Sequence, residues 1–228
     1  MYRPKDRDEL EKLIMDCYRD KLYLLDIDTS LVTDMSDIFN YHYYKKRYKI
    51  NINDIWENPN NDISQWNISV VTDINYMFVN SKFNGDISNW NTSNITNMMG
   101  MFWGSEFNRD ISPWDVSNVT YMNYMFNSSK FNHDLSPWIL SLDSNVSMVG
   151  FNIGSKHEKI YGEINGYGGF IKTVKWDSIK QHIKEILKNS SNKERYEILK
   201  KLNSFRQFSD IELDISNINI VKLYEPPF

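Results

Sequence analysis

The chain has 228 residues, of which 41% are hydrophobic and 25% charged, and its formal net charge is −4. These values are typical of a globular protein with one large domain or two small ones, and they exclude a disordered chain. A single cysteine excludes disulfide-rich scaffolds and cysteine-based zinc fingers. The apolar residues are unusual in kind, because 7 Trp, 12 Phe, 14 Tyr and 10 Met stand beside only 9 Gly.

The first segment, residues 1–24, has the pattern of a capping helix. Asp6 and Glu9 have the form of a capping box, and apolar residues follow at helical spacing: Leu10, Leu13, Ile14, Cys17 and Tyr18. We expect this helix to cover the end of the next domain, with the Cys17 thiol buried. No signal peptide or membrane-spanning run is present in the sequence, which predicts a cytoplasmic protein without a membrane contact.

A 24-residue repeat dominates residues 25–154. The strings DISQW, DISNW, DISPW and DLSPW end in tryptophans at a constant interval: Trp66, Trp90, Trp114 and Trp138. Val or Ile, Thr, Met and Phe recur in phase with them, and partial copies precede and follow. Such a chain brings equivalent side chains into ladders about 4.8 Å apart when each repeat forms one coil. The sequence predicts an α/β repeat solenoid, a right-handed coil of short parallel strands with an N-terminal helical cap and a C-terminal α/β cap.

Polar residues repeat with the same period. Asparagine, aspartate and serine recur around each tryptophan, the aspartates at Asp62, Asp86, Asp110 and Asp134. Asn and Asp side chains bond to backbone groups in turns, so we interpret these columns as structural. A calcium site would need six to eight oxygens that converge from one loop, and no such cluster is present in the sequence.

The pattern W-x-x-S-x-V-T-x-M-x-x-M-F, followed by F-N-x-D-I-S-x-W, resembles the bacterial surface protein A-like leucine-rich repeats of mycoplasma lipoproteins. The resemblance covers Leu25 to Phe151. It implies a right-handed solenoid of leucine-rich-repeat type that acts in adhesion or protein binding and has no enzymatic activity. The chain departs from this family in lacking a secretion signal and in an insertion at residues 40–61.

The insertion interleaves aromatic and basic side chains over residues 41–49 (YHYYKKRYK). Three interpretations stay open: a locally packed or solvated segment, a protein contact, and a nucleic-acid contact. The repeats themselves, residues 62–154, carry 3 Lys+Arg and 8 Asp+Glu, and this acidic balance argues against a phosphate-tracking repeat surface.

Residues 155–228 indicate a small α/β cap or subdomain, with helices expected at 176–189 and 192–205 and a strand at 211–224. The four histidines are scattered, and no catalytic or nucleotide-binding motif is present in the sequence. We therefore expect no enzyme activity, no cofactor and no metal site.

The sequence predicts a non-enzymatic protein–protein interaction module with a protein partner. It fits a phage- or virus-encoded accessory that binds and blocks a host protein. The alternatives are an extracellular adhesin whose export signal is absent here and a nucleic-acid contact through the insertion. Aromatic residues at variable positions of the repeats are candidate contacts. The candidate binding residues are Tyr76, Trp103, Tyr121 and Tyr124 in the repeats and Tyr43, Tyr44, Lys45, Lys46 and Arg47 in the insertion.

Overall fold

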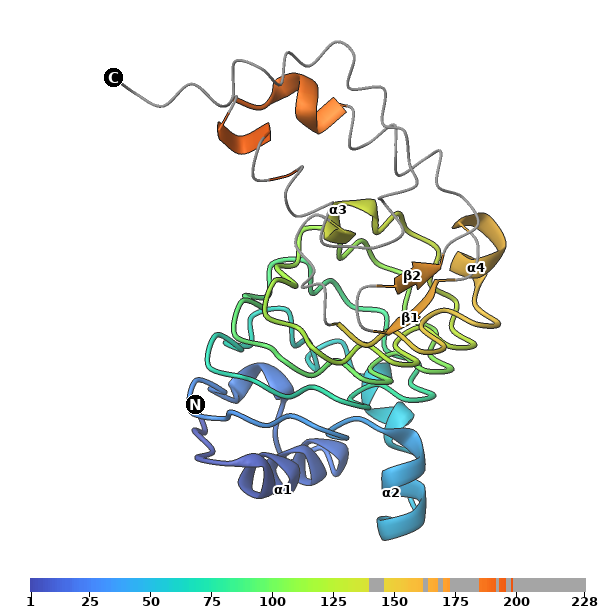
Figure 1. The fold of residues 1–228 in the computed structure, drawn as a ribbon. Helices are drawn as coiled ribbons and strands as arrows, with labels where there is room; N and C mark the ends of the chain where they lie inside the picture. Colours follow the sequence, from blue (N-terminus) through green and yellow to red (C-terminus); the bar gives the residue numbers. More distant parts are fainter. Residues whose placement is uncertain are drawn as a thin grey trace.

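The structure, a computed structural model, describes residues 1–139, 146–161, 164–167, 170–172, 185–191, 193–195 and 198. Coils of the chain lie one on another in a stack (Figure 1). Helix α1 (Arg7–Tyr18) closes one end of this stack, and the short 3-10 helix η1 (Leu24–Asp26) leads into the first coil. The insertion forms helix α2 (Tyr41–Tyr48) and the 3-10 helix η2 (Ile52–Glu57) at the same end.

Toward the other end of the stack lie α3 (Ser136–Ile139), α4 (Lys156–Tyr161) and a pair of antiparallel strands, β1 (Asn165–Tyr167) and β2 (Phe170–Lys172). The helices predicted at 176–189 and 192–205 lie mostly outside the described residues. The strand predicted at 211–224 lies wholly outside them.

The N-terminal helix is confirmed, with half of its capping box. The Asp6 carboxylate accepts a hydrogen bond from the backbone N–H of Glu9 (2.9 Å). The Glu9 side chain accepts from the backbone of Lys5 instead of from Asp6. Cys17 is 1% exposed and shares the core of the coils, as expected. Burial raises the pKa of its thiol to about 12, so the thiol stays protonated and unreactive at neutral pH.

Successive coils pair through their backbones at the 24-residue period. Parallel bridges connect Asp73 to Asn97 and Asn97 to Tyr121, and the same column continues to Asp34 at one end and Ser147 at the other. Both partial copies seen in the sequence therefore form coils of the same stack. Asp34 precedes Asp73 by 39 residues instead of 24 because the insertion lies between them.

The predicted parallel strands are absent, and this part of the prediction is wrong. In residues 1–139 and 146–161 parallel pairing is limited to isolated bridges, and the strands of the described chain are β1 and β2 alone. In each coil from Tyr76 onward the backbone is left-handed at two positions four residues apart, with φ of 54° at Tyr76 and 51° at Asn80 in the first of these coils. Tight turns close around these points. A strand needs continuously extended residues, so these turns break it. The molecule is a stack of turn-rich coils, and a strand-based leucine-rich-repeat solenoid is not supported.

The aromatic repeat residues form the core of the stack. Their rings lie nearly parallel, with centroids 5.6 Å apart for Phe78 and Phe102 and 6.3 Å for Trp90 and Trp114. Each indole N–H of the four tryptophans donates to a carbonyl of the preceding coil, for example Trp114 to Ile87 (2.9 Å). Offset aromatic stacking and a satisfied indole N–H both favour burial. The prediction that these residues stack in the interior is confirmed.

The insertion also contributes to this core. Trp56 lies with its ring centroid 4.8 Å from those of Phe39 and Phe83. Its indole N–H donates to the Ser81 hydroxyl (3.3 Å). The extra segment is thus anchored in the stack.

The polar columns are structural, as interpreted. The carboxylate of Asp86 accepts from the backbone N–H of Ser88 (3.0 Å), and Asp62 and Asp110 do the same in their coils. Threonine hydroxyls and asparagine amides donate to the backbone of the preceding coil, as Asn118 does to Ser93 (2.6 Å). These bonds hold the turns and the spacing between coils.

Candidate functional site

The four candidate residues of the repeats lie on one face of the stack. Tyr121 continues the bridged column of Asp73 and Asn97, and its side chain is 53% exposed. Trp103 is 40% exposed and Tyr124 is 38% exposed, whereas Tyr76 is half-buried. These side chains project outward between core positions, so exposure distinguishes them from the buried Phe, Met and Trp columns.

The orientation of two of these tyrosines is fixed by glycines in the next coil. Tyr76 and Tyr124 have left-handed backbones (φ 54° and 59°), and their rings lie over Gly100 and Gly150. A Cβ atom at Gly100 would lie 2.4 Å from the Tyr76 ring, and one at Gly150 would lie 2.6 Å from the Tyr124 ring. Glycine is required at both positions for this close approach. The alternation of Tyr and Gly along the column therefore presents the rings flat on the surface.

Trp103 and Tyr124 form a pair on this face. Their ring centroids lie 5.8 Å apart with an angle of 27° between planes. The pair joins two consecutive coils, and an offset stack of this kind limits the freedom of both side chains. Because the two exposed side chains are already ordered before a partner binds, they lose little conformational entropy when the partner covers them.

Two further apolar residues extend the face in the last coil. Val149 and Ile153 are each 40% exposed. Tyr124 donates its backbone N–H to the carbonyl of Val149 (2.9 Å), and Ser128 donates to Ile153 (2.7 Å). The "aromatic face" is defined here as Tyr76, Trp103, Tyr121, Tyr124, Val149 and Ile153. Val149 and Ile153 were not predicted from the sequence, because Ser147 follows Tyr121 by 26 residues and the last coil is therefore out of step with the 24-residue period.

The opposite end of the same face is acidic. Asp34 and Asp73 are bridge neighbours in the first two coils, and Asp37 precedes Tyr76 in the tyrosine–glycine column. Burial raises the pKa values of Asp37 and Asp73, and the Asn97 amide donates to the Asp73 carboxylate (3.0 Å). The face therefore changes from acidic in the first coils to aromatic and aliphatic in the last.

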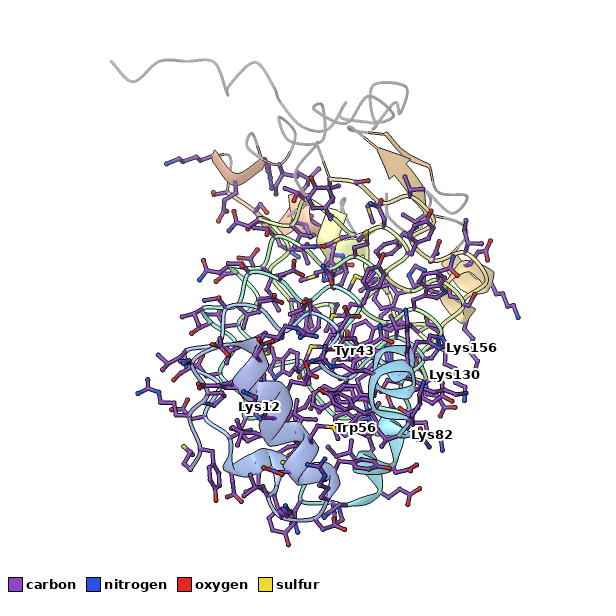
Figure 2. The ribbon with its side chains drawn as sticks, turned by 90° about the horizontal axis from the view of Figure 1, so that it is seen from below. Lys12, Tyr43, Trp56, Lys82, Lys130 and Lys156 are labelled. Carbon is purple, nitrogen blue, oxygen red and sulfur yellow. The ribbon has the colours of Figure 1, made fainter. Side chains whose placement is uncertain are left out.

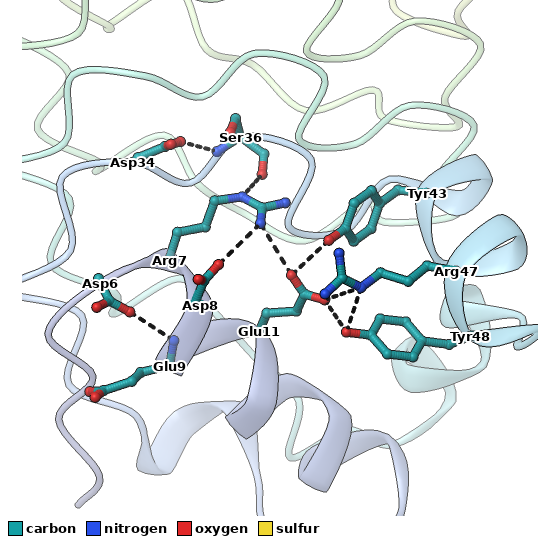
Figure 3. Close-up of polar contacts among 10 residues, drawn as sticks. All are labelled: Asp6, Arg7, Asp8, Glu9, Glu11, Asp34, Ser36, Tyr43, Arg47 and Tyr48. Atoms are coloured by element: carbon teal, nitrogen blue, oxygen red, sulfur yellow. Dashed lines mark hydrogen bonds and ion pairs between the residues drawn. The ribbon is translucent and has the colours of Figure 1, made fainter.

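The insertion divides its candidate residues between interior and surface. Tyr44 is fully buried, and the Tyr43 hydroxyl donates to the Glu11 carboxylate on α1 (2.9 Å). Arg47 lies 3.5 Å from the same carboxylate (Figure 3). Lys45 and Lys46 are exposed. The structure therefore turns Tyr43 and Tyr44 inward and leaves Lys45 and Lys46 on the surface, whereas the sequence pattern presented all of these residues as one patch.

The exposed side of α2 is basic. His42, Lys45, Lys46 and Lys49 line a shallow hollow along the helix. The three lysines follow His42 by three, four and seven residues, and this spacing places all four side chains on one helical face. The ammonium group of Lys45 lies 5.2 Å from the centre of the Tyr41 ring and covers it.

Among the described residues, no three His, Cys, Asp or Glu side chains are placed so as to hold a metal ion. In this part of the chain no helix combines the length and apolar character needed to cross a membrane.

Comparison with family models gives a match over part of the chain. A family model described as Mycoplasma protein of unknown function, DUF285, matches residues 48–160. The matched family agrees with the sequence-based resemblance in its organism group, but it is not a leucine-rich-repeat family, so that part of the resemblance is corrected. The comparisons with curated proteins and with solved structures found no match.

Proposed function

We propose that this protein is a non-enzymatic binding module that contacts a protein partner through the aromatic face. The observation that carries the proposal is the position of Trp103, Tyr121 and Tyr124 together with Val149 and Ile153. All five are large, exposed and placed on consecutive coils of one face. Exposed apolar patches on a folded protein mark contact sites, and Trp and Tyr dominate the energetic centres of such sites.

The rigid setting of these side chains supports the same function. The rings of Tyr76 and Tyr124 lie on glycines, and Trp103 stacks on Tyr124. A surface arranged in this way meets a partner without reordering, which lowers the entropic cost of binding. An accessory that blocks a host protein and an adhesin would both use such a face, and the identity of the captured partner separates them.

The test is quantitative capture from a lysate of the native host, followed by affinity measurement with the purified partner. The test variant carries Trp103→Ser and Tyr121→Ser, which remove the two most exposed aromatic rings of the face. Each central aromatic contact contributes about 2 kcal/mol, or about 30-fold in Kd, so the double variant is expected to lose at least about 30-fold and about 1,000-fold if the two contributions add.

The matched control carries Leu31→Ser and Val70→Asn. These side chains are 45% and 40% exposed, similar to Trp103, but lie outside the aromatic face. Asparagine already occupies the positions equivalent to Val70 in the next two coils, Asn94 and Asn118. The control is expected to bind as the wild type does. Equal affinity of the test variant and the wild type for the captured partner would refute the aromatic face as the contact.

A further inference from the structure

We infer that the exposed side of α2 is a second contact site, which takes an acidic segment of a protein partner, rich in Asp and Glu. This inference rests on the proposed function in so far as the occupant is a protein. It concerns a different surface, defined here as the "basic edge": His42, Lys45, Lys46, Lys49, Lys82, Lys130 and Lys156. Each of these side chains is exposed.

The charge of this surface is concentrated in α2. Residues 41–49 contain Lys45, Lys46, Arg47 and Lys49 and no acidic residue, in a chain whose net charge is −4. His42 and the three lysines line the hollow on the outer side of the helix. A carboxylate that lies in this hollow would meet ammonium groups from two successive helical turns.

The helix that carries these lysines is fixed on its inner side. The Glu11 carboxylate, 5% exposed, accepts from the hydroxyls of Tyr43 and Tyr48 and lies 3.1 Å from the Arg7 guanidinium (Figure 3). Arg47 closes the cluster from α2 and stacks over the Tyr43 ring at 5.6 Å. These contacts hold α2 against α1, so the helix presents the lysines of its outer side from a fixed position.

The basic edge continues along the stack from α2. The amide nitrogen of Asn80 lies 2.7 Å from the His42 ring, and the backbone N–H of Lys82 donates to the Asn53 side chain (2.9 Å). Lys82, Lys130 and Lys156 occupy equivalent positions of their coils. Seen from below, they lie on the side of the stack that carries α2 and away from Lys12 on α1 (Figure 2), with Lys156 in α4 toward the other end of the stack (Figure 1). Glu106 occupies the equivalent position between Lys82 and Lys130 and pairs with Lys130 at 2.9 Å.

Two observations favour an acidic protein segment over nucleic acid. The tyrosines that could stack on bases are occupied: Tyr44 is buried, the Tyr43 and Tyr48 hydroxyls bind Glu11, and Lys45 covers Tyr41. The densest part of the cationic area is also short, because α2 has eight residues and is about 12 Å long. Beyond it the row of lysines is interrupted by Glu106, which pairs with Lys130. A nucleic acid that continued beyond α2 would meet coils with 8 acidic and 3 basic residues between positions 62 and 154.

The experiment measures fluorescence anisotropy with the full chain and two labelled probes of similar charge, a peptide of ten glutamates and an oligonucleotide of ten thymidines. The test variant carries Lys45→Gln, Lys46→Gln and Lys49→Gln. The control variant carries Lys5→Gln, Lys12→Gln and Lys21→Gln, which removes the same three charges from exposed lysines elsewhere. Thermal unfolding checks that both variants are folded.

The expected result is that the peptide binds the wild type and the control equally and the test variant about tenfold more weakly, since exposed ion pairs contribute up to about 1 kcal/mol each. The oligonucleotide should bind the wild type more weakly than the peptide. Tighter binding of the oligonucleotide, equal losses in both variants, or no peptide binding at low salt would each overturn the inference. Because the probes replace the natural partner, these outcomes are independent of the Trp103 and Tyr121 variants that test the proposed function.

Discussion

Aromatic side chains in this protein either fill the core or lie on the surface, and their exposed fraction distinguishes the two groups. Trp114 donates its indole N–H to the preceding coil and is 3% exposed, whereas Trp103 has its ring on the surface and is 40% exposed. Both residues belong to the same stack, and the 24-residue period alone identified the first as a core position. Trp103 was identified because Val79 and Asn127, the equivalent residues, show that the position varies.

His157 gives a prediction at this scale. It is 1% exposed, its ring stacks against Phe131 at 5.9 Å, and its Nδ1 lies 2.9 Å from the Asn152 amide nitrogen. Burial lowers its pKa from 6.5 to about 4, while the charge of Asp134 opposes this shift. Between these values the unfolded chain takes up a proton that the folded protein does not, so the free energy of unfolding should fall as the pH falls.

Between pH 6.5 and about 4, the contribution of His157 should lower the free energy of unfolding by about 3 kcal/mol, since a change of one pKa unit corresponds to 1.36 kcal/mol. Urea unfolding of the wild type and of His157→Gln at several pH values measures it. The variant should lose stability less steeply on acidification. Parallel pH profiles for the two proteins would show that His157 is not buried in its neutral form.

At the scale of elements, α1 and α2 depend on each other through one carboxylate. Glu11 is 4% exposed and binds Arg7, Tyr43, Tyr48 and Arg47. Removal of one member of a buried charged cluster leaves the other members without compensation. The docking of α2 should therefore fail before the rest of the stack does.

Glu11→Ala should lower the free energy of unfolding by about 3 kcal/mol. It should also increase hydrogen exchange in residues 41–49 more than in the coils. Asp8→Ala is the matched control, because the Asp8 side chain is on the same helix but 86% exposed. Uniform exchange across α2 and the coils in Glu11→Ala would contradict a local role for this carboxylate.

Features that depend on local or periodic residues could be predicted from the sequence, whereas those that depend on contacts between distant residues could not. The capping of α1 by Asp6 and the stacked Phe and Trp columns depend on local or strictly periodic residues, and both were predicted correctly. The inward turn of Tyr43 depends on Glu11, 32 residues away and outside any repeat, so no period reveals it. The strands were predicted wrongly because the spacing of coils does not reveal the left-handed backbone at Tyr76.

At the scale of the whole molecule, the coils form a stack whose surface has a longer period than its core. The core repeats every 24 residues, but the column of Tyr76, Gly100, Tyr124 and Gly150 alternates over two coils. Removal of one coil keeps the core in register in every case, but its effect on this column depends on which coil is removed.

Deletion of residues 109–132 should give a folded, shorter stack, because Gly100 then meets Gly150 and no ring is displaced. Deletion of residues 85–108 should be less stable, because the Tyr76 ring then meets Tyr124 in place of a glycine. Tyr124→Gly in the second deletion should recover much of the difference. Thermal unfolding of the three proteins measures this, and equal stability of the two deletions would contradict the proposed packing of rings on glycines.

The aromatic face is tested most directly by hydroxyl-radical footprinting of the full chain with and without the captured partner. The rings of Trp103, Tyr121 and Tyr124 are exposed and react with the radical, as does Tyr23, which is 39% exposed and outside the face. We predict that oxidation of Trp103, Tyr121 and Tyr124 falls at least several-fold in the complex, while oxidation of Tyr23 is unchanged. Unchanged oxidation of Trp103, Tyr121 and Tyr124 in a saturated complex would contradict it.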